Sequence, residues 1–340
     1  MTPFDASLPL AAAPMAGGPS TPQLVRAVSA AGAFGFLAGG YRSAEQLAAD
    51  IDEVRGDVPA FGVNLFVPSA ATPDADEVRA YARRLEEDAR RAGVSLDPDR
   101  ALVPDDDAWD DKLALLRAHP VPVVSLTFGL PSAADIASLR RAGSVVLASV
   151  TTPAEARLAE EAGVDGLVVQ GPRAGGHSAC FDPRRTPTDA ATADVVRAVR
   201  AASARPLVAA GGTGGAPDVR MLRAAGADAV AVGTLFLTAD EAGTSPTHRR
   251  ALADPRFDET VLTRAFTGRP ARALRNAFAD RHSSAAPAAY PAVHHLTRGL
   301  RRAAGAHGDP EALHLWAGTG YRAAVRAPAA DIVASLAEGV

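Results

Sequence analysis

Short apolar runs alternate with longer stretches of mixed polarity from the start of the chain to about residue 238. The apolar runs have the length of buried strands, and several of the stretches between them have apolar residues at helical spacing. Thr21-Pro22 and Ser43 stand where two of these helices begin. The expected strands are residues 8–15, 34–40, 61–66, 121–128, 145–150, 166–170, 206–212 and 229–237, and the expected helices include 21–31, 74–92, 108–118, 153–162 and 217–225.

Eight strand–helix units in succession predict an α/β protein built as a (β/α)8 TIM barrel, in which the loops after the strands form the active site. A doubly wound open sheet is the alternative that this pattern also allows. After residue 238 the pattern changes to helical stretches, turns and one strand-like piece at 260–266, which predicts an added, mainly helical lobe. We expect residues 1–68, 105–238 and 322–340 to form the barrel, and residues 69–104 and 239–321 to form a lobe that covers the substrate.

Composition describes a soluble globular protein with a sizeable core, because 47% of residues are hydrophobic and 22% are charged. A net charge of -4 gives no reason to expect nucleic acid or an anionic membrane as a partner. The only cysteine, Cys180, excludes an internal disulfide and fits a reducing compartment. Since no apolar run is long enough to span a bilayer, we expect a cytoplasmic protein.

Lysine is nearly absent, and this limits the possible chemistry. Lys112, in a charged helical stretch, is the only lysine, so a Schiff base could form nowhere else. No Gly-Lys-Ser/Thr sequence of a P-loop occurs. A bound phosphate must therefore be held by backbone amides, hydroxyl groups or arginine.

The ends of the expected strands have small residues and neutral amides, and no carboxylate cluster stands among them. This argues against a metal-dependent hydrolase and a two-carboxylate glycosidase, so no metal site is expected. The loops after the seventh and eighth strands contain many glycines together with Thr213 and Thr234. Barrels often bind phosphate at these two loops, through backbone amides and hydroxyl groups. The alternative is that these glycines serve only tight turns.

The loop at 170–177 contains the clearest catalytic candidate. A buried strand leads into Gly175-Gly176-His177, where the two glycines allow the backbone to approach a ligand closely. An imidazole that titrates near neutrality could serve as a base or could polarise a bound substrate. The alternative interpretation is a tight turn that ends in a solvated histidine.

Other candidates have simpler structural interpretations. Cys180 could be a nucleophile, but no base is evident beside it, so we expect a small buried residue. His294-His295 cannot both face one site from a helix, and a surface pair is expected. We expect Trp316 and Tyr321 to pack the lobe against the barrel, although Tyr290 or Tyr321 could overhang the site.

Several stretches form a pattern that extends over nearly the whole chain. They are Ala13-Pro14-Met15-Ala16-Gly17-Gly18, Phe61-Gly62-Val63-Asn64-Leu65-Phe66, Ser125-Leu126-Thr127-Phe128-Gly129-Leu130-Pro131, Gln170 to His177, Ala210-Gly211-Gly212, Thr263 to Pro270, and Leu315-Trp316-Ala317-Gly318. Together they resemble the nitronate monooxygenases, formerly called 2-nitropropane dioxygenases. The resemblance implies a (β/α)8 barrel with an extra helical domain, non-covalently bound FMN, and oxidation of alkyl nitronates with O₂ to a carbonyl compound and nitrite.

The resemblance also assigns residues by position. It implies that His177 is the catalytic residue, which could hold a nitronate or remove the α-proton of a neutral nitroalkane. The FMN contacts that it implies are Met15, Ala16, Gly17, Asn64, Gln170, Gly175, Gly212, Ala231, Val232, Gly233 and Thr234. Three positions depart from the family's pattern and bear on substrate preference. They are Pro172-Arg173 in place of a glutamate-containing pair, Thr319 in place of glutamine, and Ala231-Val232 in place of a polar-led pair.

Two other functions remain open on the same scaffold. One is an FMN-dependent reductase that transfers hydride from NAD(P)H to a quinone or an enoyl thioester, since related barrels share the Ala174-Gly175-Gly176-His177 stretch. The other is a flavin-binding module without catalysis. The sequence does not indicate the physiological substrate, the oligomeric state or the use of NAD(P)H.

Overall fold

The computed structural model describes residues 2–69 and 72–340. Eight parallel strands close into a barrel in the order β1-β2-β3-β4-β5-β6-β8-β9, and β9 pairs back with β1. The predicted TIM barrel is therefore confirmed, and the doubly wound open sheet is wrong. The barrel strands are β1 (Leu10–Ala12), β2 (Phe34–Ala38), β3 (Gly62–Phe66), β4 (Val123–Thr127), β5 (Val145–Val150), β6 (Gly166–Gln170), β8 (Leu207–Ala210) and β9 (Ala229–Val232).

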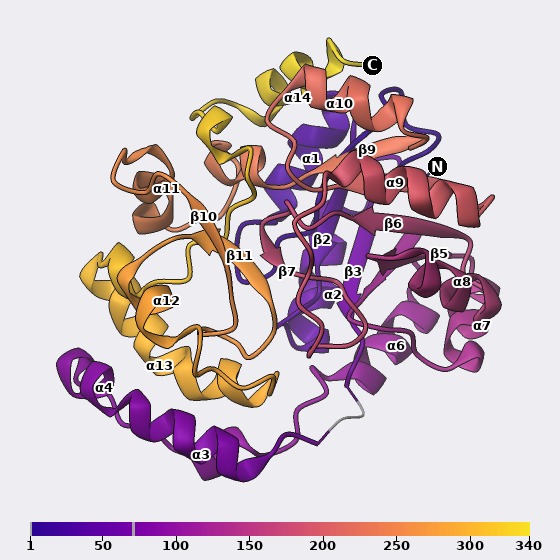
Figure 1. Ribbon diagram of the computed structural model, residues 1–340. Helices are drawn as coiled ribbons and strands as arrows, with labels where there is room; N and C mark the ends of the chain where they lie inside the picture. Colours follow the sequence, from indigo (N-terminus) through magenta and orange to yellow (C-terminus); the bar gives the residue numbers. More distant parts are fainter. Residues whose placement is uncertain (1, 70–71) are drawn as a thin grey trace.

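Helices cover the outside of the barrel (Figure 1). Their starts follow from local side chains: Thr21 accepts a hydrogen bond from the amide of Leu24, and Ser43 forms a reciprocal capping box with Gln46. The helices around the barrel are α1 (Pro22–Ala30), α2 (Ala44–Val54), α6 (Trp109–Ala118), α7 (Ala133–Arg141), α8 (Pro153–Glu161), α9 (Thr192–Ala202), α10 (Ala216–Ala224) and α14 (Ala329–Ala337).

Apolar side chains fill both the interior of the barrel and the layer between its strands and helices. Phe34, Phe36 and Leu147 pack inside the barrel among small residues such as Ala11 and Ala229. A larger cluster of Val, Leu and Ile side chains joins the outer faces of the strands to the surrounding helices. Because both faces of each strand are buried, the strands appear in the sequence as continuous apolar runs.

A second, three-stranded antiparallel sheet lies outside the barrel, in the order β10-β11-β7. Its strands are β7 (Gly176–His177), β10 (Thr260–Thr263) and β11 (Ala271–Leu274). The strand-like piece expected at 260–266 is therefore shorter, and β11 and β7 were missed. In the register, Ala271 lies opposite His177, so the sheet ties the loop after β6 to the segment inserted after the barrel.

The two segments expected to form the lobe share one apolar cluster. Val78, Tyr81 and Leu85 from the first segment pack with Phe266 and Leu296 from the second. Figure 1 shows α3 and α4 running alongside α13, although these elements are far apart in the sequence. The exact domain boundaries stay a prediction. The helices of these segments are α3 (Ala75–Arg84), α4 (Glu86–Ala92), α5 (Pro98–Ala101), α11 (Pro246–Ala253), α12 (Ala277–His282) and α13 (Ala292–His307), with short 3-10 turns η2 (Pro310–Ala312) and η3 (Tyr321–Ala323).

Two local expectations need correction. The strand expected at 229–237 ends at Val232, and η1 (Thr234–Thr238) is a 3-10 helix that begins just after Gly233. The helix expected at 74–92 is two helices that meet at Leu85. Lys112, in the charged helical stretch, is 1% exposed, and its Nζ lies 2.8 Å from Oδ2 of Asp107. Among the described residues, no helix has both the length and the apolar character needed to cross a membrane.

Candidate active site

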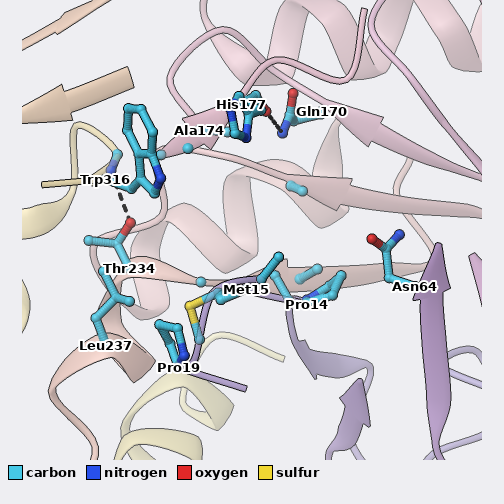
Figure 2. A pocket seen from close by; sticks show the side chains of 18 of the residues that line it. Pro14, Met15, Pro19, Asn64, Gln170, Ala174, His177, Thr234, Leu237 and Trp316 are labelled. Carbon is cyan, nitrogen blue, oxygen red and sulfur yellow. Dashed lines mark hydrogen bonds between the residues drawn. The ribbon is translucent and has the colours of Figure 1, made fainter. Parts of the chain in front are cut away.

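A cavity of about 370 Å³ lies at the carboxyl ends of the barrel strands. In Figure 2, Met15 and Pro19 lie on one side of this cavity, and His177 and Gln170 lie on the other. All of the site residues expected from the sequence line the cavity, while their contacts with a ligand stay a prediction. They are Met15, Ala16, Gly17, Asn64, Gln170, Gly175, His177, Gly212, Ala231, Val232, Gly233 and Thr234.

One end of the cavity is built from backbone and hydroxyl groups. Gly212 has a φ of +81°, which glycine adopts readily. The Gly318 amide donates to Oγ1 of Thr234 at 2.9 Å, and a Cβ on Gly318 would lie 2.8 Å from the carbonyl oxygen of Arg173. Oγ1 of Thr213 is buried and has no partner among the described residues. An unpartnered hydroxyl group beside a glycine-rich loop and the start of a helix suits a phosphate.

Asn64 is fixed by its amide group. Its Nδ2 donates to Oγ of Ser125 and to Oγ1 of Thr127, both at 2.9 Å, and to the Ser125 carbonyl oxygen at 3.2 Å. Its Oδ1 accepts no hydrogen bond from the described residues. The Asn64 side chain is buried and lines the cavity, so its Oδ1 can accept a hydrogen bond from a ligand that binds there.

Gln170 holds the loop that follows β6. Its Nε2 donates to the His177 carbonyl oxygen at 3.0 Å, and its Oε1 accepts from the Ala179 amide at 2.7 Å. The first of these bonds is drawn in Figure 2. The carboxamide thus fixes the main chain on both sides of Ser178, and with it the position of the histidine.

His177 has one polar side-chain partner and several aromatic neighbours. Its Nε2 lies 2.9 Å from Oγ1 of Thr267. The ring centroids of Phe128, Tyr290 and Trp316 lie 5.6, 5.8 and 5.3 Å from that of the imidazole. This packing holds the ring in one place and covers part of it, so that the side chain is half-buried.

The protonation of His177 differs from the sequence-based expectation. Burial, together with the positive charges of Arg269 and Arg301, lowers its pKa from 6.5 to about 3. The imidazole is therefore uncharged at physiological pH and does not titrate near neutrality. It can accept or donate a hydrogen bond, but it supplies no fixed positive charge.

The wall beside His177 contains strained backbone. Tyr41 and Phe128, which line the cavity, have φ values of +66° and +84° although neither is glycine. Phe66 packs between them, with ring centroids 5.4 Å from that of Tyr41 and 4.5 Å from that of Phe128. Such conformations persist only where the surroundings enforce them, and they are concentrated at functional sites.

Comparison with known proteins identifies the family. A sequence model of the family described as nitronate monooxygenase matches residues 4–339. The chain belongs to this family. A nitronate monooxygenase from Pseudomonas aeruginosa is 37% identical over 346 residues, which cover 97% of this chain and 95% of the relative.

Solved structures agree with this assignment. A nitroalkane oxidase from Streptomyces ansochromogenes is 46% identical, covers 98% of this chain and 97% of its own, and has a TM-score of 0.92. FabK from Thermotoga maritima is 25% identical, covers 98% of this chain and 92% of its own, and has a TM-score of 0.75. The protein is therefore a flavin-dependent oxidoreductase of the nitronate monooxygenase family, and FMN is its cofactor.

The cavity of this family member fits FMN. At one end, the unpartnered hydroxyl of Thr213 and the loop at Gly212 fit the phosphate. Further along, the free oxygen of Asn64 and the amide side chain of Gln170 offer neutral hydrogen-bonding groups for the flavin ring. Among the described residues, no group of three or more His, Cys, Asp or Glu side chains could hold a metal ion.

Several expectations about aromatic and histidine residues change. Trp316 does not simply join the lobe to the barrel, because it lines the cavity beside His177. Tyr290 lies next to His177, whereas Tyr321 packs away from it and donates to the Phe257 carbonyl oxygen at 2.8 Å.

The His294-His295 pair is not on the surface. His294 is buried and stacks on Tyr41 at 4.3 Å between ring centroids, because it points inward from α13. His295 Nε2 lies 2.9 Å from Oδ2 of Asp105. Cys180 is buried, as expected.

Sequence reasoning missed Tyr41, Phe128 and Thr267 as site residues. Phe128 and Thr267 were inside stretches that carried the family resemblance, so the stretches were noticed but their individual roles were not. Tyr41 follows Gly39-Gly40 at the end of β2, and a strand-end aromatic residue could have been flagged there.

Proposed function

We propose that the protein oxidises alkyl nitronates with O₂ to a carbonyl compound and nitrite. The observation that carries the proposal is the position of His177, an uncharged, half-buried imidazole on the cavity wall that faces Met15 (Figure 2). When bound, FMN supplies the acceptance of electrons from the substrate and their delivery to O₂. The residues of the chain bind, orient and shield the reactants.

Two regions of the cavity have different roles, one toward the phosphate of FMN and one toward its ring. Gly212, Thr213, Gly233 and Thr234 would hold the phosphate of FMN, while Asn64, Gln170 and the backbone of Met15 to Gly17 would hold the flavin. The substrate would bind beside His177, within the aromatic wall of Phe128, Tyr290 and Trp316. This wall excludes water and leaves room for a small aliphatic substrate.

His177 acts on the substrate through its ring nitrogens. The Thr267 hydroxyl group can donate to Nε2 or accept from it, because a hydroxyl is both donor and acceptor. The neutral ring can therefore present either a proton or a lone pair on its other nitrogen. A nitronate oxygen needs only the donor form, whereas a neutral nitroalkane must first lose its α-proton to the lone pair. Because the low pKa of His177 makes its ring a weak base, we expect nitronates to be turned over faster than nitroalkanes.

The experiment is steady-state turnover of the FMN-loaded protein with propionate 3-nitronate, followed by oxygen uptake and nitrite release. We expect both, and we expect His177→Asn to lower both. His119→Asn, at an exposed position, is the matched control and should leave them unchanged. The alternative is an FMN-dependent NAD(P)H:quinone or enoyl reductase on the same scaffold. Rapid NADH oxidation with a quinone, without nitrite release from nitronate, would favour that alternative.

The lobe formed by residues 69–104 and 239–321 is proposed to cover the substrate. Trp316, Tyr290 and Thr267 all come from the second of these segments and stand beside His177. The cytoplasmic location stays a prediction of the sequence.

A further inference from the structure

Two arginine side chains are buried behind the wall that contains His177. Arg269 is 1% exposed and Arg301 is 8% exposed. Arg269 donates through Nε to the Ser178 carbonyl oxygen at 3.2 Å and through Nη2 to the Cys180 carbonyl oxygen. Its guanidinium carbon lies 4.0 Å from the centre of the Phe128 ring. Since Phe128 lines the cavity, one aromatic ring separates this charge from the substrate chamber.

Arg301 approaches the same chamber from α13. Its Nε donates to Oγ1 of Thr297 at 3.1 Å, and its Nη2 donates to the His294 carbonyl oxygen at 2.9 Å. Nη2 also lies 3.2 Å from Nδ1 of His294, which therefore accepts and is uncharged. His294 stacks on Tyr41, a cavity-lining residue. This second charge is separated from the chamber by the His294–Tyr41 pair.

Neither guanidinium group has a carboxylate partner among the described residues. The hydrogen bonds of the two guanidinium groups go to carbonyl oxygens, a hydroxyl group and an imidazole. Glu155, an acid that influences Arg269, lies 2.9 Å from Arg185 and is paired with it. A buried positive charge without a counter-ion costs free energy, and a nearby anion recovers part of that cost. At the effective dielectric constant of a protein site, such a charge acts over several ångströms.

We propose that the buried guanidinium groups of Arg301 and Arg269 determine the preference of the chamber for an anionic substrate, while His177 forms a hydrogen bond with that substrate. The identity of the anion as a nitronate rests on the proposed function. The two arginines act through space and through Phe128, His294 and Tyr41, so they are specificity-determining residues and not catalytic ones. The same charges oppose protonation of His177, so the positive charge at this site belongs to arginine.

The proposal predicts how anion binding depends on pH. Burial lowers the pKa of Arg301 to about 10, so its charge persists from pH 5 to 9. Anion binding should be flat across that range. The titratable and charged groups that face Arg301 from the surrounding elements are Tyr41, Tyr290, Arg298, His294, His314 and His177. Burial lowers the pKa values of the three histidines and raises those of the two tyrosines, which favours the uncharged form of all five side chains near neutral pH.

The test measures binding of nitrate, a planar anion that is not a substrate, to the FMN-loaded protein by calorimetry. Acetamide is the neutral planar control. In Arg301→Gln the Kd for nitrate should rise about tenfold or more, as expected for one charge acting over roughly 10 Å at an effective dielectric constant of about 20. The Kd for acetamide should not change. Arg301→Lys should retain nitrate binding, because it keeps the charge.

Arg302→Gln is the matched control, because Arg302 is the next residue of α13 and is exposed. Arg302→Gln also removes one positive charge, but from the protein surface, and it should leave the Kd for nitrate unchanged. If Arg301→Gln does not fold, the pH profile of the unmodified protein still decides the question. Nitrate binding that strengthens tenfold per pH unit below about pH 6.5 would place the charge on a histidine and overturn the proposal, as would an unchanged Kd in Arg301→Gln. Because nitrate binding needs no turnover, these results stand apart from whether nitronates are oxidised.

Discussion

Oγ1 of Thr267 lies 2.9 Å from Nε2 of His177. Thr267 belongs to the turn between β10 and β11, outside the barrel, whereas His177 follows barrel strand β6. The inserted segment therefore orients the residue on which the proposed chemistry depends. In Thr267→Val the imidazole loses the one polar side-chain partner that it has among residues 2–69 and 72–340, and we expect kcat/KM for nitronate to fall roughly tenfold.

The matched variant for this prediction is Thr267→Ser, which keeps the hydroxyl group and should retain most of the activity. FMN content, measured by absorbance, should be the same in both variants, because Thr267 does not line the cavity. Equal losses of activity in the valine and serine variants would show that packing, and not the hydrogen bond, matters at this position.

A second prediction concerns the phosphate end of the cavity. Gly212→Asp should abolish FMN retention, because it places a carboxylate beside the expected phosphate. Gly212 has a φ of +81°, and a Cβ there would lie 2.8 Å from Cβ of Arg173. Gly212→Asn has nearly the same size and tolerates this backbone conformation. The asparagine variant should bind FMN more weakly than the unmodified protein but far better than the aspartate variant. Full FMN occupancy in Gly212→Asp would remove this loop from the phosphate site.

A third prediction concerns the ion pair between the buried Lys112 and the half-buried Asp107. The carboxylate of Asp107 also accepts from the Tyr41 amide at 2.8 Å, so it supports the strained residue at the cavity wall. Lys112→Met leaves this carboxylate without its counter-ion and should lower the free energy of unfolding by about 3–5 kcal/mol. Urea denaturation measures the change.

The control lies on the same helix. Arg117 forms an ion pair with Asp135 at 2.8 Å, but both side chains are partly exposed. Arg117→Met should lower the free energy of unfolding by about 1 kcal/mol or less. The double variant Lys112→Met with Asp107→Asn should recover part of the loss. Similar effects of Lys112→Met and Arg117→Met would contradict the account of a buried charge.

The fourth prediction is a loss of stability in mild acid. Burial lowers the pKa of His177 to about 3 and that of His248 to about 4, and it also lowers the pKa values of His294 and His314. The unfolded chain binds protons at these residues below about pH 6.5, whereas the folded protein does not. The stabilisation is therefore complete above pH 6.5 and is lost as the pH falls toward 3–4.

Each buried histidine should contribute up to about 1.4 kcal/mol per pH unit within that window. Urea midpoints at pH 7.5 and pH 5.5 measure the combined effect, and we expect a large decrease at the lower pH. His314→Gln should reduce this dependence on pH, while His119→Asn, at an exposed position, should not. A midpoint that stays constant between the two pH values would mean that these histidines are not held neutral.

The barrel could be predicted from the sequence because each strand is buried on both faces and ends in a recognisable loop. The same loops identified the cavity, since glycines and Thr213 at strand ends have a local signature. The small sheet could not be predicted, because β7 has only two residues and pairs with β11 across the inserted segment. Pairing over such a distance leaves no local pattern.

The protonation state of His177 and the burial of His294 could not be predicted from the sequence either. A histidine after two glycines suggests a group that titrates near neutrality, but its pKa depends on burial and on Arg269 and Arg301, which are distant in the chain. His294 appeared to be a surface residue because helical spacing alone does not say which face of α13 is covered. Tertiary packing, and not local pattern, determines both properties.

The most direct test of the proposed function is anaerobic mixing of the FMN-loaded protein with propionate 3-nitronate and, separately, with NADH, followed by the visible absorbance of the flavin. We predict rapid bleaching by the nitronate alone and slow or no bleaching by NADH. Rapid bleaching by NADH together with an unchanged spectrum in the presence of nitronate would contradict the account and identify a reductase.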